Sequence, residues 1–223
     1  MKVINRIKSE SIIAIDVETV RVVQNYQDLD IQTQTAWQYK HKVEGEVPSE
    51  EELSEKWVKS ASLYAEFSKI CAVSIVIIHK EKLFCKEFYG SNEHNILESL
   101  NNTLDSLYNK NSDYKIIGHS SKFFDYPFLA KRYIINELQL PDSLDVTNEK
   151  PWTNPLLDTN DLWKMGGTGY GSTLLALCNV LKIPTSKTDL VGDEVGEAYF
   201  NSEFGRIGRY CSLDTIATFN IFR

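Results

Sequence analysis

Two carboxylates follow a strongly apolar run near the start of the chain. In the stretch IIAIDVETV, Asp16 and Glu18 come directly after four apolar residues. Such a run is typical of a strand that is buried on both faces, and residues i and i+2 of a strand point to the same side of the sheet. The two side chains could therefore bind one hard cation through oxygen atoms. The alternative is an ordinary strand end that reaches water.

Further acidic positions lie far along the chain. In GHSSKFFDYPFL, a strand is expected to end and a helix to begin near Asp125, where helix capping is the ordinary explanation for an aspartate. In RYCSLDT, Tyr210 and Asp214 stand four residues apart and share one face of a helix. Neighbours such as Ile207 and Cys211 recur at helical spacing around them. This pattern favours an inward-facing pair over a surface pair.

Together, the Asp-x-Glu pair, the FFDYPFL segment and the Tyr-x-x-x-Asp spacing resemble the tyrosine branch of the DEDD superfamily of 3′→5′ exonucleases. Within that branch, the order of the motifs and their residues resemble those of the proofreading exonuclease domain of family B DNA polymerases and its stand-alone relatives. The resemblance extends from about Ser11 to the C-terminus and is weakest over residues 21–60. It implies an α/β domain with a ribonuclease-H-like mixed β-sheet flanked by α-helices.

The resemblance also implies a two-metal-ion mechanism that releases nucleotides from the 3′ end of single-stranded DNA. Asp16 would bridge two divalent ions, Mg²⁺ or Mn²⁺, with Glu18 and Asp214 completing one site and Asp125 holding the other largely through water. Oxygen ligands suit both metals. Tyr210 would orient the attacking water, and these five residues form the predicted catalytic set.

Candidate substrate contacts lie close to the acidic positions. The resemblance places Thr19 at the terminal nucleotide and Ser120 beside the substrate strand, while His119 and Phe124 are further candidates from their chemistry and their position near Asp125. Ser120 stands where the family usually has asparagine, so one nucleotide contact departs from the pattern. The Phe124 ring could stack on a base, a contact that is indifferent to sequence. For the His119 ring, a structural hydrogen bond is the alternative role.

Elsewhere, apolar periodicity and turn residues predict the elements that must position these side chains. We expect one 3′→5′ exonuclease domain over residues 1–223, with an insertion at 21–65 that carries an acidic helical segment. Ser49 and Glu52 form a capping-box pattern at the start of that helix. The other predicted elements are strands 12–20, 70–79, 82–89 and 114–119, helices 91–108 (capped by Ser91), 124–137, 172–183 and 202–222, and a loop at 141–155.

Composition bounds the class of protein. The 223 residues carry a net charge of −7, which argues against a protein that binds nucleic acid mainly through a positively charged surface. However, six glutamates fall within residues 44–56, so most of the excess negative charge belongs to one segment. Like charges there are expected to keep the insertion away from the substrate strand. No run approaches the ~20 apolar residues of a membrane span, and the first residues do not resemble a secretory signal. We therefore expect a cytoplasmic protein without a membrane partner.

Several alternatives stay open from the sequence. The four cysteines are widely spaced, which predicts buried free thiols rather than a zinc site or disulfides. The expected partner is the 3′ end of single-stranded DNA, although RNA would suit the same mechanism, and no protein partner is indicated. An inactive nucleic-acid-binding protein is the competing class. Since no polymerase portion follows Arg223, a free-standing nuclease or a subunit without synthesis is expected.

Overall fold

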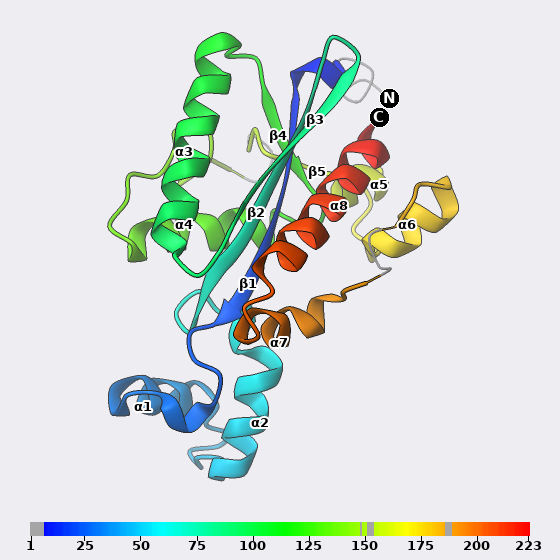
Figure 1. Ribbon diagram of the computed structural model, residues 1–223. Coiled ribbons are helices and arrows are strands. Elements are labelled where there is room, and N and C mark those ends of the chain that lie inside the picture. Colours follow the sequence, from blue (N-terminus) through cyan, green and yellow to red (C-terminus); the bar gives the residue numbers. More distant parts are fainter. Residues whose placement is uncertain (1–6, 148, 151–153, 186–188) are drawn as a thin grey trace.

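A five-stranded mixed sheet forms the centre of the computed structural model, which describes residues 7–147, 149–150, 154–185 and 189–223. The strand order is β3-β2-β1-β4-β5, so β1 is the central strand (Figure 1). β1 pairs antiparallel with β2 and parallel with β4, while β3 and β5 form the two edges. The strands are β1 (Ile12–Arg21), β2 (Ser68–His79), β3 (Lys82–Tyr89), β4 (Lys115–Gly118) and β5 (Leu157–Asp158).

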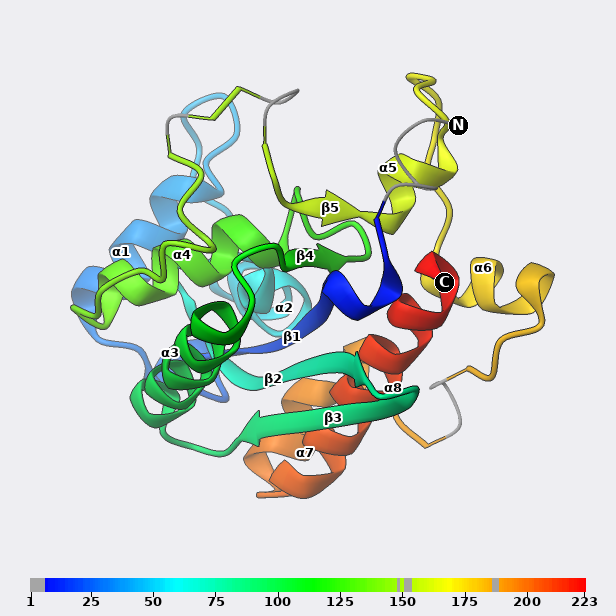
Figure 2. The ribbon, with the colours of Figure 1, turned by 90° about the horizontal axis from the view of Figure 1, so that it is seen from above.

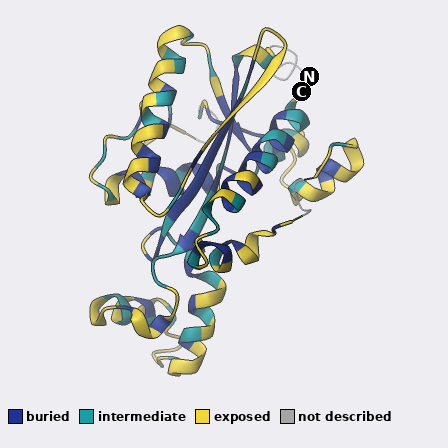
Figure 3. Ribbon diagram, in the orientation of Figure 1, coloured by how far each residue is buried: buried dark blue, intermediate teal, exposed yellow. Residues whose placement is uncertain are grey.

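Helices cover both faces of this sheet (Figure 2). On one face lie α3 (Glu93–Lys110) and α4 (Asp125–Ile135), and on the other lies the long C-terminal α8 (Phe204–Phe222) with α7 (Val195–Phe200) beside it. The central strands are buried between them, whereas β3 is largely exposed (Figure 3). This arrangement confirms the predicted ribonuclease-H-like α/β fold. The remaining helices are α1 (Ile31–Lys40), α2 (Glu50–Ser60), α5 (Thr159–Trp163) and α6 (Leu174–Leu181).

Alternation along β1 divides its side chains between the two faces. Ile13 and Ile15 belong to the apolar cluster with α3 and α4, whereas Ile12 and Ala14 pack in a different cluster with Phe219 of α8. The even-numbered positions of β1 therefore face α8, because successive strand residues point to opposite sides.

The insertion has a hydrophobic cluster of its own. α1 and α2 lie below the sheet in Figure 1, joined to it by the ends of β1 and β2. Trp37 and Trp57 are completely buried there, with ring centroids 5.1 Å apart in an edge-to-face arrangement. The other buried members of this cluster are Tyr26, Leu29, Leu53, Ala61 and Phe67.

Several predicted local features are confirmed. β2 and β3 form the expected hairpin, and Lys80 and Glu81 at its turn both have positive φ. The capping box of α2 is present, with Ser49 as the N-cap and Glu52 reaching back to its backbone. The sequence predicts a helix from residue 49 to about 65, but α2 ends at Ser60 and the chain continues as a 3₁₀ turn, Ala61–Leu63.

Other predictions are wrong. Asn92, not Ser91, caps α3 by accepting a hydrogen bond from the Asn95 amide. Cys85 is exposed, whereas Cys71, Cys178 and Cys211 are buried as expected. The short elements α1, β5, α5 and α7 were not anticipated. The described part of the 141–155 loop has no helix or strand, while residues 148 and 151–153 lie outside the described residues, as do residues 1–6 and 186–188.

Candidate active site

The alternation of β1 directs two acidic side chains toward α8. Asp16 and Glu18 occupy even-numbered positions, and both are partly buried beside the sheet. A bulge follows at once, between Glu18 and Thr19. Two thiols contact the strand just before the bulge: Cys211 Sγ lies 3.4 Å from the Asp16 carbonyl, and Cys71 Sγ lies 3.4 Å from the Glu18 carbonyl. The sequence places Cys211 beside Tyr210 and Asp214, but it gives no signal for Cys71 at the site.

α8 and α4 complete the acidic group. Tyr210 and Asp214 lie on the buried side of α8, with exposed fractions of 5% and 6%. Asp125, 5% exposed, is the first residue of α4, and its Oδ1 accepts a hydrogen bond from the Val17 amide at 3.3 Å. The N-cap is Phe124, so the helix-cap explanation for Asp125 is wrong. Three elements thus bring together the five residues that the sequence singled out.

The carboxylates act on one another electrostatically. Burial raises the pKa of Asp16 well above its usual range, and the negative charges of Glu18, Asp125 and Asp214 raise it further. Burial also raises the pKa of Asp125, to about 6. A group of acids that oppose one another's ionisation gains from a cation placed among them.

The Tyr210 hydroxyl belongs to the same group. Burial raises the pKa of Tyr210, and so do the nearby charges of Glu18, Asp214 and Asp16 and a hydrogen bond to Asp214. The phenol therefore remains protonated at neutral pH and is available as a hydrogen-bond donor rather than as a base.

The donor set near β1 consists of oxygen and one thiol. Ligand atoms of Asp16, Glu18 and Cys211 all lie within 4.8 Å of one another. Burial raises the pKa of the Cys211 thiol well above its usual range, and Asp16 and Glu18 raise it further. Since the thiolate is the metal-binding form of cysteine, the carboxylates are the better ligands here, and they suit Mg²⁺ or Mn²⁺.

The GHSS turn between β4 and α4 is fixed by residues that sequence reasoning missed. Asp158 is 2% exposed and accepts hydrogen bonds from the amides of Ser120 and Lys122, at 2.9 and 3.1 Å. Asn160 Nδ2 donates to Ser120 Oγ at 2.8 Å. Ser120 has φ of 60°, a left-handed conformation that these bonds hold in place. The residues around Asp158 carry no pattern that marks this role, because β5 has only two residues, Leu157–Asp158.

His119 uses both of its ring nitrogens within this same region. Nδ1 lies 2.9 Å from Thr159 Oγ1, and Nε2 lies 3.0 Å from the Ser172 carbonyl. Burial lowers the pKa of His119, which favours the neutral ring. These contacts support the structural alternative for His119 over a direct contact with substrate.

Most of the chain, residues 60–223, matches a family described as "Predicted 3'-5' exonuclease related to the exonuclease domain of PolB". The chain belongs to this family. A family B DNA polymerase from the hyperthermophilic archaeon Pyrobaculum calidifontis has a similar fold, with a TM-score of 0.56 and 13% sequence identity. The alignment covers 93% of this chain and 23% of the polymerase, so the polymerase is far longer. No curated protein sequence matched the chain.

In this member of the exonuclease family, a cavity of about 520 Å³ opens directly beside the acidic group. Val17, Glu18, Thr19 and Phe124 line it from β1 and the start of α4. Thr19 Oγ1 donates to the Ser62 carbonyl at 2.8 Å, which joins the strand end to the insertion. Two of the predicted substrate residues, Thr19 and Phe124, thus share one cavity with a predicted catalytic residue.

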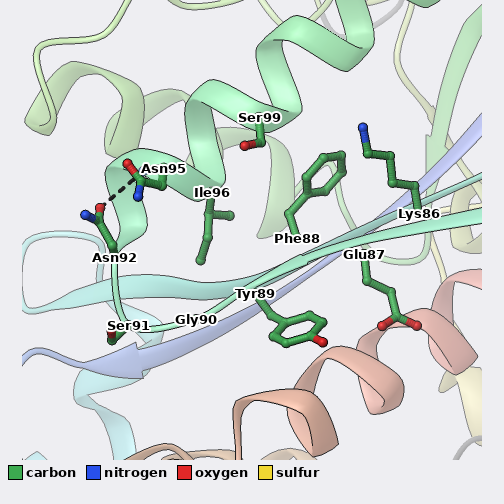
Figure 4. A pocket seen from close by; sticks show the side chains of 10 residues that line it. All are labelled: Lys86, Glu87, Phe88, Tyr89, Gly90, Ser91, Asn92, Asn95, Ile96 and Ser99. Atoms are coloured by element: carbon green, nitrogen blue, oxygen red, sulfur yellow. Dashed lines mark hydrogen bonds between the residues drawn. The ribbon is translucent and has the colours of Figure 1, made fainter.

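A second cavity, of about 560 Å³, lies between the end of β3 and α3 (Figure 4). Phe88, Asn95 and Ile96 are among its lining residues, and the Asn92 side chain beside it bonds to the Asn95 amide. None of the five predicted catalytic residues lines it. Its size alone does not make it an exonuclease site.

No helix in the described part of the chain is both long and apolar enough to cross a membrane.

Proposed function

We propose that the protein is a metal-dependent 3′→5′ exonuclease that releases nucleotides from the 3′ end of single-stranded DNA. The observation that carries this proposal is the meeting of Asp16, Glu18, Asp125 and Asp214 from β1, α4 and α8, with Tyr210 among them. Membership of a family related to the PolB exonuclease domain supports both the polarity and DNA as the substrate.

The four carboxylates would hold two divalent ions, Mg²⁺ or Mn²⁺. They supply only oxygen ligands, and their mutual repulsion is relieved by positive charge. When bound, such a pair of ions makes water nucleophilic near neutral pH and offsets the charge that develops on the phosphate oxygens.

The chain's own groups position the reactants. The protonated Tyr210 hydroxyl would donate a hydrogen bond that orients the attacking water, while Asp214 on the same helix face accepts from that hydroxyl. Phe124 would stack on a base of the single strand, and the Thr19 backbone would face the terminal nucleotide.

A direct test uses 5′-labelled single-stranded DNA and RNA of the same sequence, incubated with Mn²⁺ or with EDTA. The expected result is a ladder that shortens by one nucleotide at a time on DNA, only when Mn²⁺ is present. A 3′-terminal phosphate should slow the reaction, since the pocket would accept a free hydroxyl.

Four results would count against the proposal. Full activity in EDTA would exclude metal dependence, and internal fragments as first products would indicate an endonuclease. Faster shortening of RNA than of DNA would make the protein an exoribonuclease. Binding without any cleavage would favour the inactive nucleic-acid-binding class.

A further inference from the structure

The cavity beside Glu18 has a second wall that comes from the insertion. Val58 and Lys59 near the end of α2, and Ser62 and Leu63 in the following 3₁₀ turn, line the same 520 Å³ space as Phe124. Val58 and Lys59 precede the family match, which begins at residue 60. We call Val58, Lys59 and Leu63 the insertion wall.

Two hydrogen bonds fix the insertion wall, one within the insertion and one to the end of β1. The Trp57 indole donates to the Val23 carbonyl at 3.1 Å, and Trp57 itself is completely buried. The bond from Thr19 Oγ1 to Ser62 ties the next turn to the strand end. These two hydrogen bonds therefore fix the position of the insertion wall beside the acidic group.

The chemistry of the wall is that of a partly apolar, partly cationic surface. Val58 and Leu63 are each 56% exposed despite being apolar. Lys59 is exposed, and Arg21 enters the same cavity with its Nε bonded to the Gln24 carbonyl at 2.9 Å. A nucleobase fits such a surface, because its faces are apolar and its edges carry hydrogen-bond acceptors.

We propose that the insertion wall contacts the base of the 3′-terminal nucleotide, with Val58 and Leu63 against the base and Lys59 donating to acceptors at its edge. The inference rests on the proposed exonuclease function and adds a binding surface that lies partly outside the family-matched region, at Val58 and Lys59. The acidic residues 44–52 lie at the start of α2 and in the segment before it, while the wall lies at the other end of the helix. The expectation that like charges keep the insertion away from the strand therefore applies only to its acidic end.

The test compares two 5′-labelled DNA strands that differ only in the last nucleotide, which carries thymine in one strand and is abasic in the other. Single-turnover cleavage is measured across enzyme concentrations for wild type, Leu63→Ala and Lys59→Ala. Each variant should raise the half-saturating concentration about 3- to 10-fold on the thymine strand, the size expected for one apolar or charged contact. The maximal rate should change little. On the abasic strand, both variants should behave like wild type.

Matched variants separate contact from folding. Lys56 is one turn earlier on α2 and lines a different cavity, so Lys56→Ala should match wild type on both strands. Lys59→Arg should restore most of the loss, because it keeps the charge and the donors.

Equal losses on the two strands would overturn the inference and assign the wall a purely structural role. No loss on either strand would overturn it as well, since the wall would then touch nothing. If wild type cleaved neither strand while Mn²⁺ was present, the proposed function itself would be wrong, and the inference with it.

Discussion

Two regions of this molecule carry acidic side chains in opposite surroundings. At the sheet, burial and then neighbouring carboxylates raise the pKa of Asp16, and burial raises that of Asp125 to about 6. In the insertion, Asp30 and Glu52 are exposed, and hydrogen bonds lower the pKa of each. Thr33 donates to Asp30, and Ser49 donates to Glu52.

The contrast distinguishes the acids of the proposed active site from acids at the starts of helices. The insertion carboxylates each have donors at hand, because they sit at the starts of α1 and α2, where free amides favour negative charge. At the sheet, burial and the neighbouring carboxylates instead raise the pKa of Asp16, an arrangement that opposes folding unless a cation is present. The number of acidic residues in a segment therefore does not indicate a metal site. The burial of each carboxylate and the charges around it are better indicators.

The largest expected effect comes from Asp16→Asn. Removing one carboxylate from the centre of the group should reduce cleavage at least about 10³-fold, as expected when a ligand of a two-metal site is lost. Glu52→Gln is the matched change in the insertion and should leave the cleavage rate unaltered. Single-turnover assays with Mn²⁺ measure both. Equal activity of Asp16→Asn and wild type would show that the sheet acids are not catalytic.

A smaller loss is expected when the hydroxyl of Tyr210 is removed. Orienting and proton-transfer effects typically contribute ~10²–10⁴-fold, so Tyr210→Phe should fall within or somewhat below that range with little change in substrate affinity. Asp214→Asn should be worse, because it weakens a metal ligand. Both are measured at saturating Mn²⁺. A Tyr210→Phe enzyme as fast as wild type would reduce the tyrosine to a packing residue.

The sheet acids should also make stability depend on pH and metal. Because folding raises the pKa of Asp125 to about 6, its contribution to stability is present at low pH and is lost as the pH rises from about 4 through 6. That contribution amounts to at most ~3 kcal/mol in the metal-free protein. Mn²⁺ should therefore raise the melting temperature more at pH 7 than at pH 5. An equal or absent shift at both pH values would contradict the raised pKa of Asp125 as the origin of the effect.

In the insertion, the matching test concerns the cap of α2. Ser49→Ala removes the side chain that accepts from the Glu52 amide, and loss of such a cap lowers the free energy of unfolding by about 1 kcal/mol. Urea unfolding measures the change, and cleavage should be unaffected. Ser91→Ala is the control, because Asn92 caps α3 instead. Equal stability of Ser49→Ala and wild type would mean that the capping box contributes nothing to folding.

Strong periodicities made the centre of the fold predictable. The β1 run and the β2–β3 hairpin follow directly from apolar residues and turn chemistry, and the site residues followed from the family resemblance. α1 was missed because, among its residues, only Trp37 is buried, so its sequence carries almost no helical apolar stripe. β5 has two residues, and its pairing with β4 is a tertiary event without a local signal.

The lack of a local signal also explains why Asp158 and Lys59 could not be assigned to the site from the sequence. Asp158 serves the site only through backbone amides about forty positions away, and Lys59 reaches the cavity only because the turn after α2 is bonded to Thr19 of β1. Neither relation leaves a pattern in the nearby residues. The part of the site that could be predicted consists of the groups that would do the chemistry, whereas the groups that would position them had to be seen in the structure.

The smallest effect should come from the acidic end of the insertion. Deleting residues 44–56 would also remove the buried Leu53 and the cap of α2, so deletion would confound charge with folding. Glu44, Glu46 and Glu51 are exposed, and changing all three to glutamine removes charge alone.

The repulsion between these glutamates and DNA extends far at low salt, with a Debye length of about 30 Å at 0.01 M, but only about 8 Å at 0.15 M. The triple variant should therefore bind single-stranded DNA about 2- to 3-fold more tightly at low salt and like wild type at physiological salt, with an unchanged maximal cleavage rate. Fluorescence anisotropy with Ca²⁺ in place of Mn²⁺ measures the affinity. A lower cleavage rate in the folded triple variant would place these glutamates in the active site and remove the distinction between the two acidic regions.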